Sequence, residues 1–156
     1  MHSSEWNRQS AFTLIELLIA LVIVAALLSV AVPTYQEYVE RARRTAAIKD
    51  IAEISLAIER HLSQAGTYPN SLADLNPAPP LDSWGHAYQY LGIDVVPPPN
   101  RGAVRKDKNL NPLNSDYDLY SMGPDGQTQR PLTAAKARDD IVRAGNGGFI
   151  GLASEH

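Results

Sequence analysis

One apolar segment near the N-terminus constrains this chain more than any other feature. Between Phe12 and Val32 the only residues that are not apolar are Thr13, Glu16 and Ser29. At about 1.5 Å per helical residue, the segment would extend roughly 31 Å as a helix, which matches the hydrocarbon thickness of a membrane. We therefore expect a transmembrane helix followed by a domain in water.

A secretory signal peptide is the simplest alternative explanation of an apolar N-terminus. This segment is longer than the usual apolar core of such a peptide and contains a carboxylate, Glu16, near its start. It is followed by Pro33 and more helix-like sequence, where a signal peptide would have a small-residue cleavage pattern and a polar mature start. A plain signal anchor stays open as an alternative, although it does not account for Glu16.

The expected helix continues well beyond the apolar segment. From Thr13 to about Gln64 the chain has no glycine and a single proline, Pro33, which predicts one long helix that bends at that proline. Gly66 is a typical end signal. The second half is amphipathic and is expected to pack on a compact head, because its apolar stripe recurs at spacings of three and four through Ile48, Ile51, Ser55, Ile58 and Leu62.

The head has the pattern of short strands joined by loops. Residues 86–93 and 115–123 alternate in a way that suits two antiparallel strands, and the final apolar piece at 149–152 suits a last strand. The stretch 94–114 between the first two is rich in proline, asparagine and charge, so we expect an exposed connection. The fold class is therefore α+β. The stripe of the helix is expected to pack against an aromatic cluster of Trp84, Tyr88 and Tyr90.

Charge and residue types exclude several kinds of function. The net charge is −3 and the basic residues are scattered, so no nucleic-acid binding is expected. The one basic cluster, Arg41, Arg43 and Arg44, follows the apolar segment and suits lipid headgroups. The chain has no cysteine, so it cannot form a disulfide. It also lacks the G-x-S-x-G motif that would indicate a hydrolase.

The segment from Ala11 to Pro33 resembles the N-terminus of type IV pilins and type II secretion pseudopilins. It has a small residue before Phe12, a glutamate as the fifth residue counted from that Phe, and a proline further along. The segments "AGTYPNS", "LDSWGHAYQYL" and "YDLYSMGPDG" are similar to parts of the major pseudopilin, the general secretion pathway protein G family. The loop from Val95 to Asn114 is unusual for that family.

This resemblance implies that the chain is a membrane protein whose leader is cut off after synthesis. It also implies that the chain is not an enzyme. A prepilin peptidase would remove a leader, residues 1–11, by cutting between Ala11 and Phe12, and would methylate the new amino group of Phe12. The segment 12–33 would be the transmembrane and assembly helix, 34–65 the amphipathic helix and 66–156 a periplasmic head. The chain would cross the bacterial inner membrane once, with its N-terminus in the cytoplasm.

The resemblance also implies what the chain assembles with. Mature subunits would stack into a periplasmic filament, together with an inner-membrane secretion platform and minor pseudopilins, and would drive proteins across the outer membrane. A type IV pilin for adhesion, motility or DNA uptake is the alternative within the class. A membrane-anchored enzyme or binding domain is a more distant alternative, and it would need a convergent polar pocket.

Glu16 is the first candidate functional residue. An ionised carboxylate at membrane depth costs several kcal/mol unless it is paired. After cleavage, the amino group of Phe12 in the same or a neighbouring subunit would supply a cation, so Glu16 would set the register of assembly. The alternative is a side chain that extends to the membrane surface. Pro33 is the second residue that we assign to assembly.

A calcium site is the second candidate, and it is implied by the resemblance. In the family, loop carboxylates and backbone carbonyls hold the ion, which takes about six to eight oxygen ligands. The alternative is an Asp-Gly turn and a solvated carboxylate pair. The matching residues are Asp125, the adjacent Asp139 and Asp140, and Leu119 and Ser121 as carbonyl donors.

Overall fold

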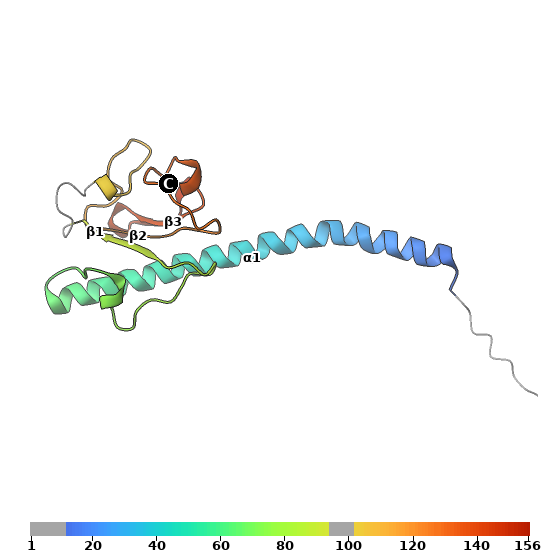
Figure 1. Ribbon diagram of the computed structural model, residues 1–156, viewed down its shortest axis with the longest axis horizontal. Helices are drawn as coiled ribbons and strands as arrows, with labels where there is room; N and C mark the ends of the chain where they lie inside the picture. The colour runs from blue at the N-terminus through green and yellow to red at the C-terminus, as the bar shows by residue number, and fades with distance from the viewer. Residues whose placement is uncertain (1–11, 94–101) are drawn as a thin grey trace, which may run out of the picture. The chain divides into compact units, whose positions relative to one another are not determined.

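The computed structural model of the chain describes residues 12–93 and 102–156. The expected leader, residues 1–11, lies outside the described residues, and so does Ala11 at the expected cleavage point. The chain forms two compact units that divide between Glu40 and Arg41, within its long helix (Figure 1).

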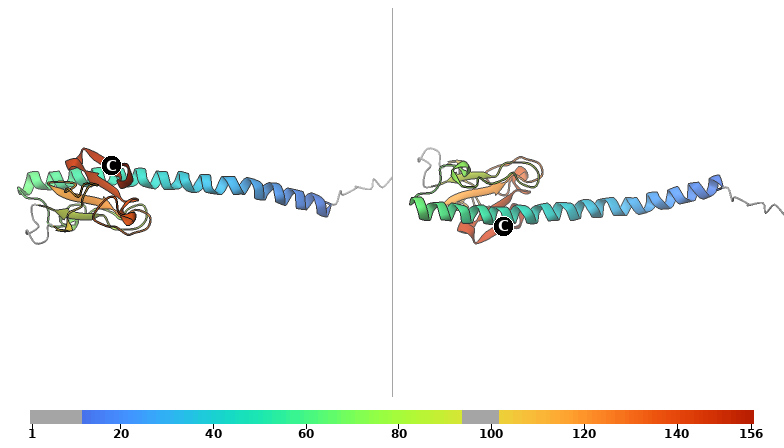
Figure 2. Two further views of the ribbon diagram at one scale, coloured as in Figure 1. Left: turned by 90° about the horizontal axis from the view of Figure 1, so that it is seen from above. Right: turned by 90° about the horizontal axis from the view of Figure 1, so that it is seen from below.

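That helix, α1 (Leu14–Ala65), is the one that the absence of glycine predicts, and it forms a continuous element (Figure 2). It remains helical through Pro33, although proline has no N–H to contribute to the hydrogen-bond ladder. At its C-terminal end, Gly66 has a φ of +75° and its N–H donates to the carbonyl of Leu62 at 2.8 Å. This residue therefore ends the helix, as predicted.

The first unit leaves its apolar side chains uncovered. Every residue from 12 to 38 is exposed, and Phe12 and Leu21 have exposed fractions of 80% and 66%. A closed unit in water would bury such side chains, so this surface is complete only when lipid or other protein surrounds it. Within the described part of the chain, α1 is the one helix long and apolar enough to cross a membrane.

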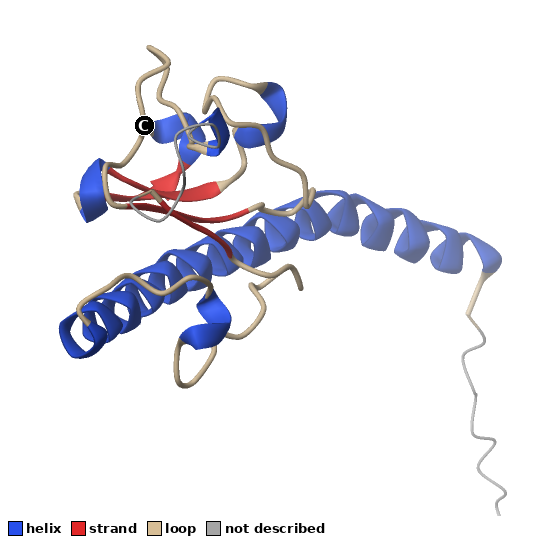
Figure 3. Ribbon diagram, turned by 60° about the vertical axis from the view of Figure 1, so that its left-hand side comes forward, coloured by secondary structure: helices blue, strands red, loops and turns tan. Residues whose placement is uncertain are grey.

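The second unit contains a four-stranded sheet in the order β1-β2-β3-β4, with each strand antiparallel to its neighbours (Figure 3). The strands are β1 (Gln89–Gly92), β2 (Tyr117–Ser121), β3 (Ile141–Ala144) and β4 (Phe149–Leu152). β1 and β2 lie within the two segments expected to be strands, and β4 matches the expected last strand. The α+β fold class is therefore confirmed.

β3 is the strand that the alternation pattern does not predict. All four of its residues are buried, the charged Arg143 included, so no alternation of apolar and exposed polar residues marks its period. Val142 of β3 lies opposite Tyr120 of β2. β3 follows directly on Asp139 and Asp140, so this acidic pair precedes an interior strand of the sheet.

The core of the second unit lies between α1 and one face of the sheet. Ile51 and Ile58 of the predicted stripe are fully buried, and they belong to one cluster with Tyr117 of β2. Burying a side chain of this size contributes about 1.5–3 kcal/mol. The aromatic side chains predicted for this core belong to it, with Tyr88 buried and Trp84 and Tyr90 partly buried.

A smaller apolar cluster covers the other face of the sheet, and it corrects one expectation. In the described part of the connection between β1 and β2, residues 102–114, the side chains of Val104, Arg105, Leu113 and Asn114 are buried. The expectation of an exposed connection is therefore wrong for these residues. They fold back over the sheet, where the cluster contains Leu113, Leu132, Val142, Ala144 and Ala153.

Candidate functional site

The first turn of α1 holds Glu16 in a local hydrogen-bond arrangement. The backbone N–H and the hydroxyl of Thr13 both donate to Glu16 Oε2 at 2.8 Å, and the N–H of Glu16 donates to Thr13 Oγ1 at 3.3 Å. This is a capping box, and the T-x-x-E spacing of the sequence is its signature. Thr13 is thus a residue that the sequence interpretation missed. The bonds supply donors to Glu16 but no cation, so its pairing with Phe12 of another subunit stays a prediction.

The oxygen atoms of Glu16 are used unequally. Both bonds from Thr13 end on Oε2, and within the described residues Oε1 accepts none. A cation from outside the chain can therefore reach Oε1 without breaking the first turn of the helix. Glu16 lies on the exposed apolar surface of the first unit, where lipid or neighbouring subunits would surround it.

Of the expected calcium ligands, Asp125 belongs to a tight turn and Asp139 lies beside that turn. Asp125 is exposed, and its Oδ1 accepts from the N–H of Gln127 at 2.7 Å, as in an Asp-Gly turn. Gly123 of this turn has a φ of +63° and packs so closely that an added Cβ would clash with the carbonyl oxygen of Asp139. Asp139 therefore lies beside the turn.

Asp140 is directed elsewhere. Its side chain is fully buried, and Oδ2 accepts from Arg105 Nη2 at 2.7 Å and from Thr128 Oγ1 at 2.5 Å. Burial raises the pKa of Asp140 to about 6, although the bond from Thr128 and the charge of Arg105 act in the opposite direction. Its carboxylate is thus already occupied by a cation of the chain itself.

The two expected carbonyl donors belong to β2. Leu119 lies opposite Tyr90 in the ladder, and the Ser121 hydroxyl donates to Asp82 Oδ2 at 2.5 Å while accepting from the N–H of Gly123 at 3.1 Å. Across residues 12–93 and 102–156, no group of three or more His, Cys, Asp or Glu side chains could hold a metal ion. As placed, the expected donors are not gathered into one calcium shell, because the carboxylate of Asp140 and the hydroxyl of Ser121 already bond within the chain.

A second ion pair, in which Arg143 is buried and Asp116 partly buried, lies near the opposite end of β2. Arg143 donates to both oxygens of Asp116, at 2.9 and 2.7 Å, and its guanidinium lies 4.0 Å from the ring centroid of Tyr117. Burial acts to raise the pKa of Asp116, but the bonds from Arg143 and from the N–H of Tyr117 outweigh it and hold the pKa below its usual value. Sequence spacing contains no signal for this pair, because its members are far apart in the chain.

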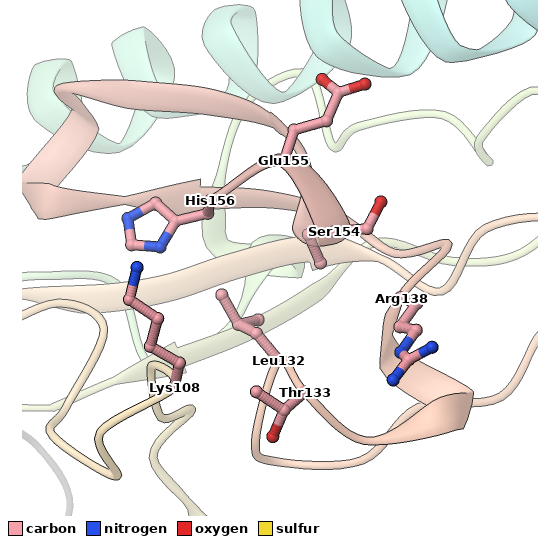
Figure 4. Close-up of a pocket in the computed structure, with 8 residues that line it drawn as sticks. Lys108, Leu132, Thr133, Arg138, Ser154, Glu155 and His156 are labelled. Atoms are coloured by element: carbon pink, nitrogen blue, oxygen red, sulfur yellow. The ribbon is translucent and has the colours of Figure 1, made fainter.

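The head also has a pocket of about 530 Å³ beside the C-terminus. Figure 4 shows that Ser154, Glu155 and His156 at its edge point away from one another. Lys108, Thr133 and Arg138 are the other polar residues of the lining. The polar side chains of this pocket come from four separate segments of the head.

Two family models match the chain. The prokaryotic N-terminal methylation motif matches residues 6–32, and the model of the type IV minor pilin ComP, DNA uptake sequence receptor, matches residues 33–94. No solved structure gives a significant match.

Curated relatives extend the similarity through most of the chain. The type II secretion system core protein G of Pseudomonas aeruginosa is 30% identical over 142 residues, which cover 78% of this chain and 87% of the relative. The protein of the same name from Klebsiella pneumoniae is 30% identical and covers 86% and 94%. The type IV major pilin protein PilE1 of Neisseria gonorrhoeae is 29% identical and covers 88% and 78%. Because the similarity extends over most of this chain and of its relatives, the chain belongs to the type II secretion system core protein G family, within the wider class of pilins.

Proposed function

We propose that the chain is a structural subunit of a type II secretion pseudopilus, a filament that drives protein export across the outer membrane. The observation that carries the proposal is the apolar surface of the first unit, which is exposed from residue 12 to 38 while the second unit has its own closed core. Lipid covers such a surface before assembly, and the same surface of neighbouring subunits covers it afterwards. The relatives named as secretion core proteins support this reading over an enzymatic one.

Removal of the leader prepares the assembly contact. A prepilin peptidase would cut between Ala11 and Phe12 and methylate the new amino group, as the match to the N-terminal methylation motif over residues 6–32 supports. The new ammonium of Phe12 would then pair with Oε1 of Glu16 in a neighbouring subunit, since Thr13 uses only Oε2. A charge pair that is complete only between subunits favours assembly in one register.

The proposal also fixes the orientation and the partners of the chain. The N-terminus lies in the cytoplasm and the second unit in the periplasm, with one crossing of the inner membrane. The arginines that follow the membrane segment, Arg41, Arg43 and Arg44, suit the headgroups of that membrane. The secretion platform in the inner membrane and minor pseudopilins are the proteins that the subunit would contact besides copies of itself.

Deletion of the gene in its native organism tests this function. We expect that the exported proteins accumulate in the periplasm of the deletion strain and that the wild-type gene restores export. The alternative, a type IV pilin, has some support from the ComP match over residues 33–94 and from the PilE1 relative. If export were normal while twitching, adhesion or DNA uptake failed, the chain would be a pilin of that second kind.

A further inference from the structure

Arg105 and Asp140 form an ion pair that joins distant parts of the second unit. Arg105 lies in the segment 102–114 between β1 and β2, whereas Asp140 immediately precedes β3. Their side chains are 4% and 0% exposed, and Nη2 donates to Oδ2 at 2.7 Å. Because a charge inside a protein is costly without a partner, each of these two groups depends on the other.

Two further contacts fix the guanidinium in place. Nη1 of Arg105 donates to Thr128 Oγ1 at 2.6 Å, and Thr128 donates in turn to the same oxygen of Asp140. The guanidinium carbon lies 4.1 Å from the ring centroid of Tyr120, which is a cation–π distance. The arginine, the threonine and the aspartate thus form a closed triangle over β2.

The backbone of Arg105 is tied down as well. Its N–H donates to Asp118 Oδ2 at 2.6 Å, and the other oxygen of Asp118 accepts from Asn114 Nδ2 at 3.0 Å. Two buried carboxylates, on Asp118 and Asp140, therefore face this one arginine from two different segments. The network connects the segment 102–114, β2, Thr128 and the start of β3.

The positive charge of Arg105 opposes the binding of a divalent cation at Asp140. Oδ2 already has two donors, and an added ion would lie within a few ångströms of the guanidinium, where like charges repel strongly in a buried site. The second oxygen, Oδ1, is buried without a partner among the described residues, but one oxygen supplies only a small part of the shell that calcium needs.

We propose that Arg105 takes the place of a bound divalent cation in this chain, so that the C-terminal part of the head is held to the sheet by the guanidinium and is independent of calcium. The inference concerns the stability of the head alone. It stands or falls separately from the proposed role in secretion, because its test needs no filament and no exported protein.

Thermal unfolding of the full chain in detergent tests the proposal. We expect the unfolding midpoint of the wild type to be the same with calcium chloride as with EGTA. Arg105→Gln should lower the midpoint by about 10 °C or more, because it leaves Asp140 buried without its cation. Arg138→Gln is the matched control, since Arg138 is exposed and its substitution removes one arginine charge without touching the network.

Two results would overturn the proposal. One is a wild-type midpoint that rises with calcium and falls with EGTA, which would place a metal ion in the role given to Arg105. The other is a midpoint of Arg105→Gln equal to that of Arg138→Gln. If Arg105→Gln does not fold, the calcium titration of the wild type still decides the question, and Asp140→Asn with the arginine retained provides a second variant that should lower the midpoint.

Discussion

The two units of the chain use the same aliphatic residues in opposite ways. In the first unit Ile19 is 53% exposed, although it lies in an apolar run, while in the second unit Ile51 is fully buried against the sheet. Among the described residues, all those from 12 to 38 are exposed, whereas the second unit has a closed core, one buried ion pair and one partly buried ion pair. Assembly therefore depends on the first unit and folding stability on the second, so changes in the two should have separable effects.

Glu16→Ala should give the largest effect, and the effect should be confined to assembly. Without the carboxylate, the ammonium of Phe12 in a neighbouring subunit has no partner in the membrane, so filaments should be lost. Membrane insertion and the thermal stability of the head should not change. The measurement is the amount of sheared filament recovered from cells, with membrane fractionation to confirm insertion.

Glu16→Gln separates the charge from the hydrogen bonds of that residue. The amide oxygen can still accept from Thr13, so the first turn of α1 should persist while the ion pair is lost. We expect Glu16→Gln to assemble as poorly as Glu16→Ala. Normal filaments from either variant would show that assembly does not depend on the charge of Glu16.

Replacing an isoleucine by alanine should change the free energy of unfolding in the second unit but not in the first. Ile51→Ala opens a cavity in the core and should lower the free energy of unfolding by about 2–5 kcal/mol. Ile19→Ala removes the same atoms from an exposed position and should leave the unfolding of the head unchanged. Chemical denaturation of both full-length variants in detergent measures the difference. Similar losses in the two variants would contradict the separation of stability from assembly.

A smaller effect inside the second unit is expected at Gly123. Its φ of +63° costs an alanine about 1–2 kcal/mol, and the added Cβ would also clash with the carbonyl oxygen of Asp139. Gly66→Ala is the matched control, because Gly66 has a φ of +75° and no atom within 4 Å of an added Cβ. Gly123→Ala should therefore lose more stability than Gly66→Ala, as measured by urea denaturation.

The smallest effect is on the pH dependence of the head, where the two ion-paired aspartates, Asp116 and Asp140, act in opposite directions. The pKa of Asp116 is lowered on folding, so its contribution to stability is present above about pH 4 and is lost as the pH falls through its folded pKa. The pKa of Asp140 is raised to about 6, so its contribution is greatest below about pH 4 and is lost as the pH rises through 6.

Variants of these two residues should change the slope of stability against pH with opposite signs. Asp140→Asn should make the free energy of unfolding rise more steeply between about pH 4 and 6, by up to roughly 1 kcal/mol per pH unit. Asp116→Asn should flatten the loss of stability below about pH 4. Urea denaturation over this range measures both slopes, and parallel profiles for the two variants would be inconsistent with the opposite shifts.

Much of the fold could be predicted because its signals are local. The absence of glycine predicts α1, alternation predicts β1 and β2, and a terminal apolar run predicts β4. β3 escapes prediction because all its residues are buried and no alternation marks it. The segment 102–114 was expected to be exposed because Val104 and Leu113 are isolated among polar residues, and only tertiary packing shows that they are core.

The candidate site could be predicted only in part, for the same reason. Glu16 stands out as a lone carboxylate in an apolar run, and its cap on Thr13 follows from the T-x-x-E spacing. Asp140 is visible as half of an acidic pair, but its partner Arg105 lies 35 residues away in a different segment. No spacing rule joins an arginine and an aspartate that are so far apart in the chain.

Electron microscopy of cells that produce this chain together with its processing and secretion components tests the central claim most directly. The account predicts filaments that an antibody against the head, residues 66–156, labels along their whole length, and that are absent when Glu16 is replaced by alanine. If the processed chain remained dispersed in the membrane as single subunits while protein export proceeded normally, the account of a filament subunit would be contradicted.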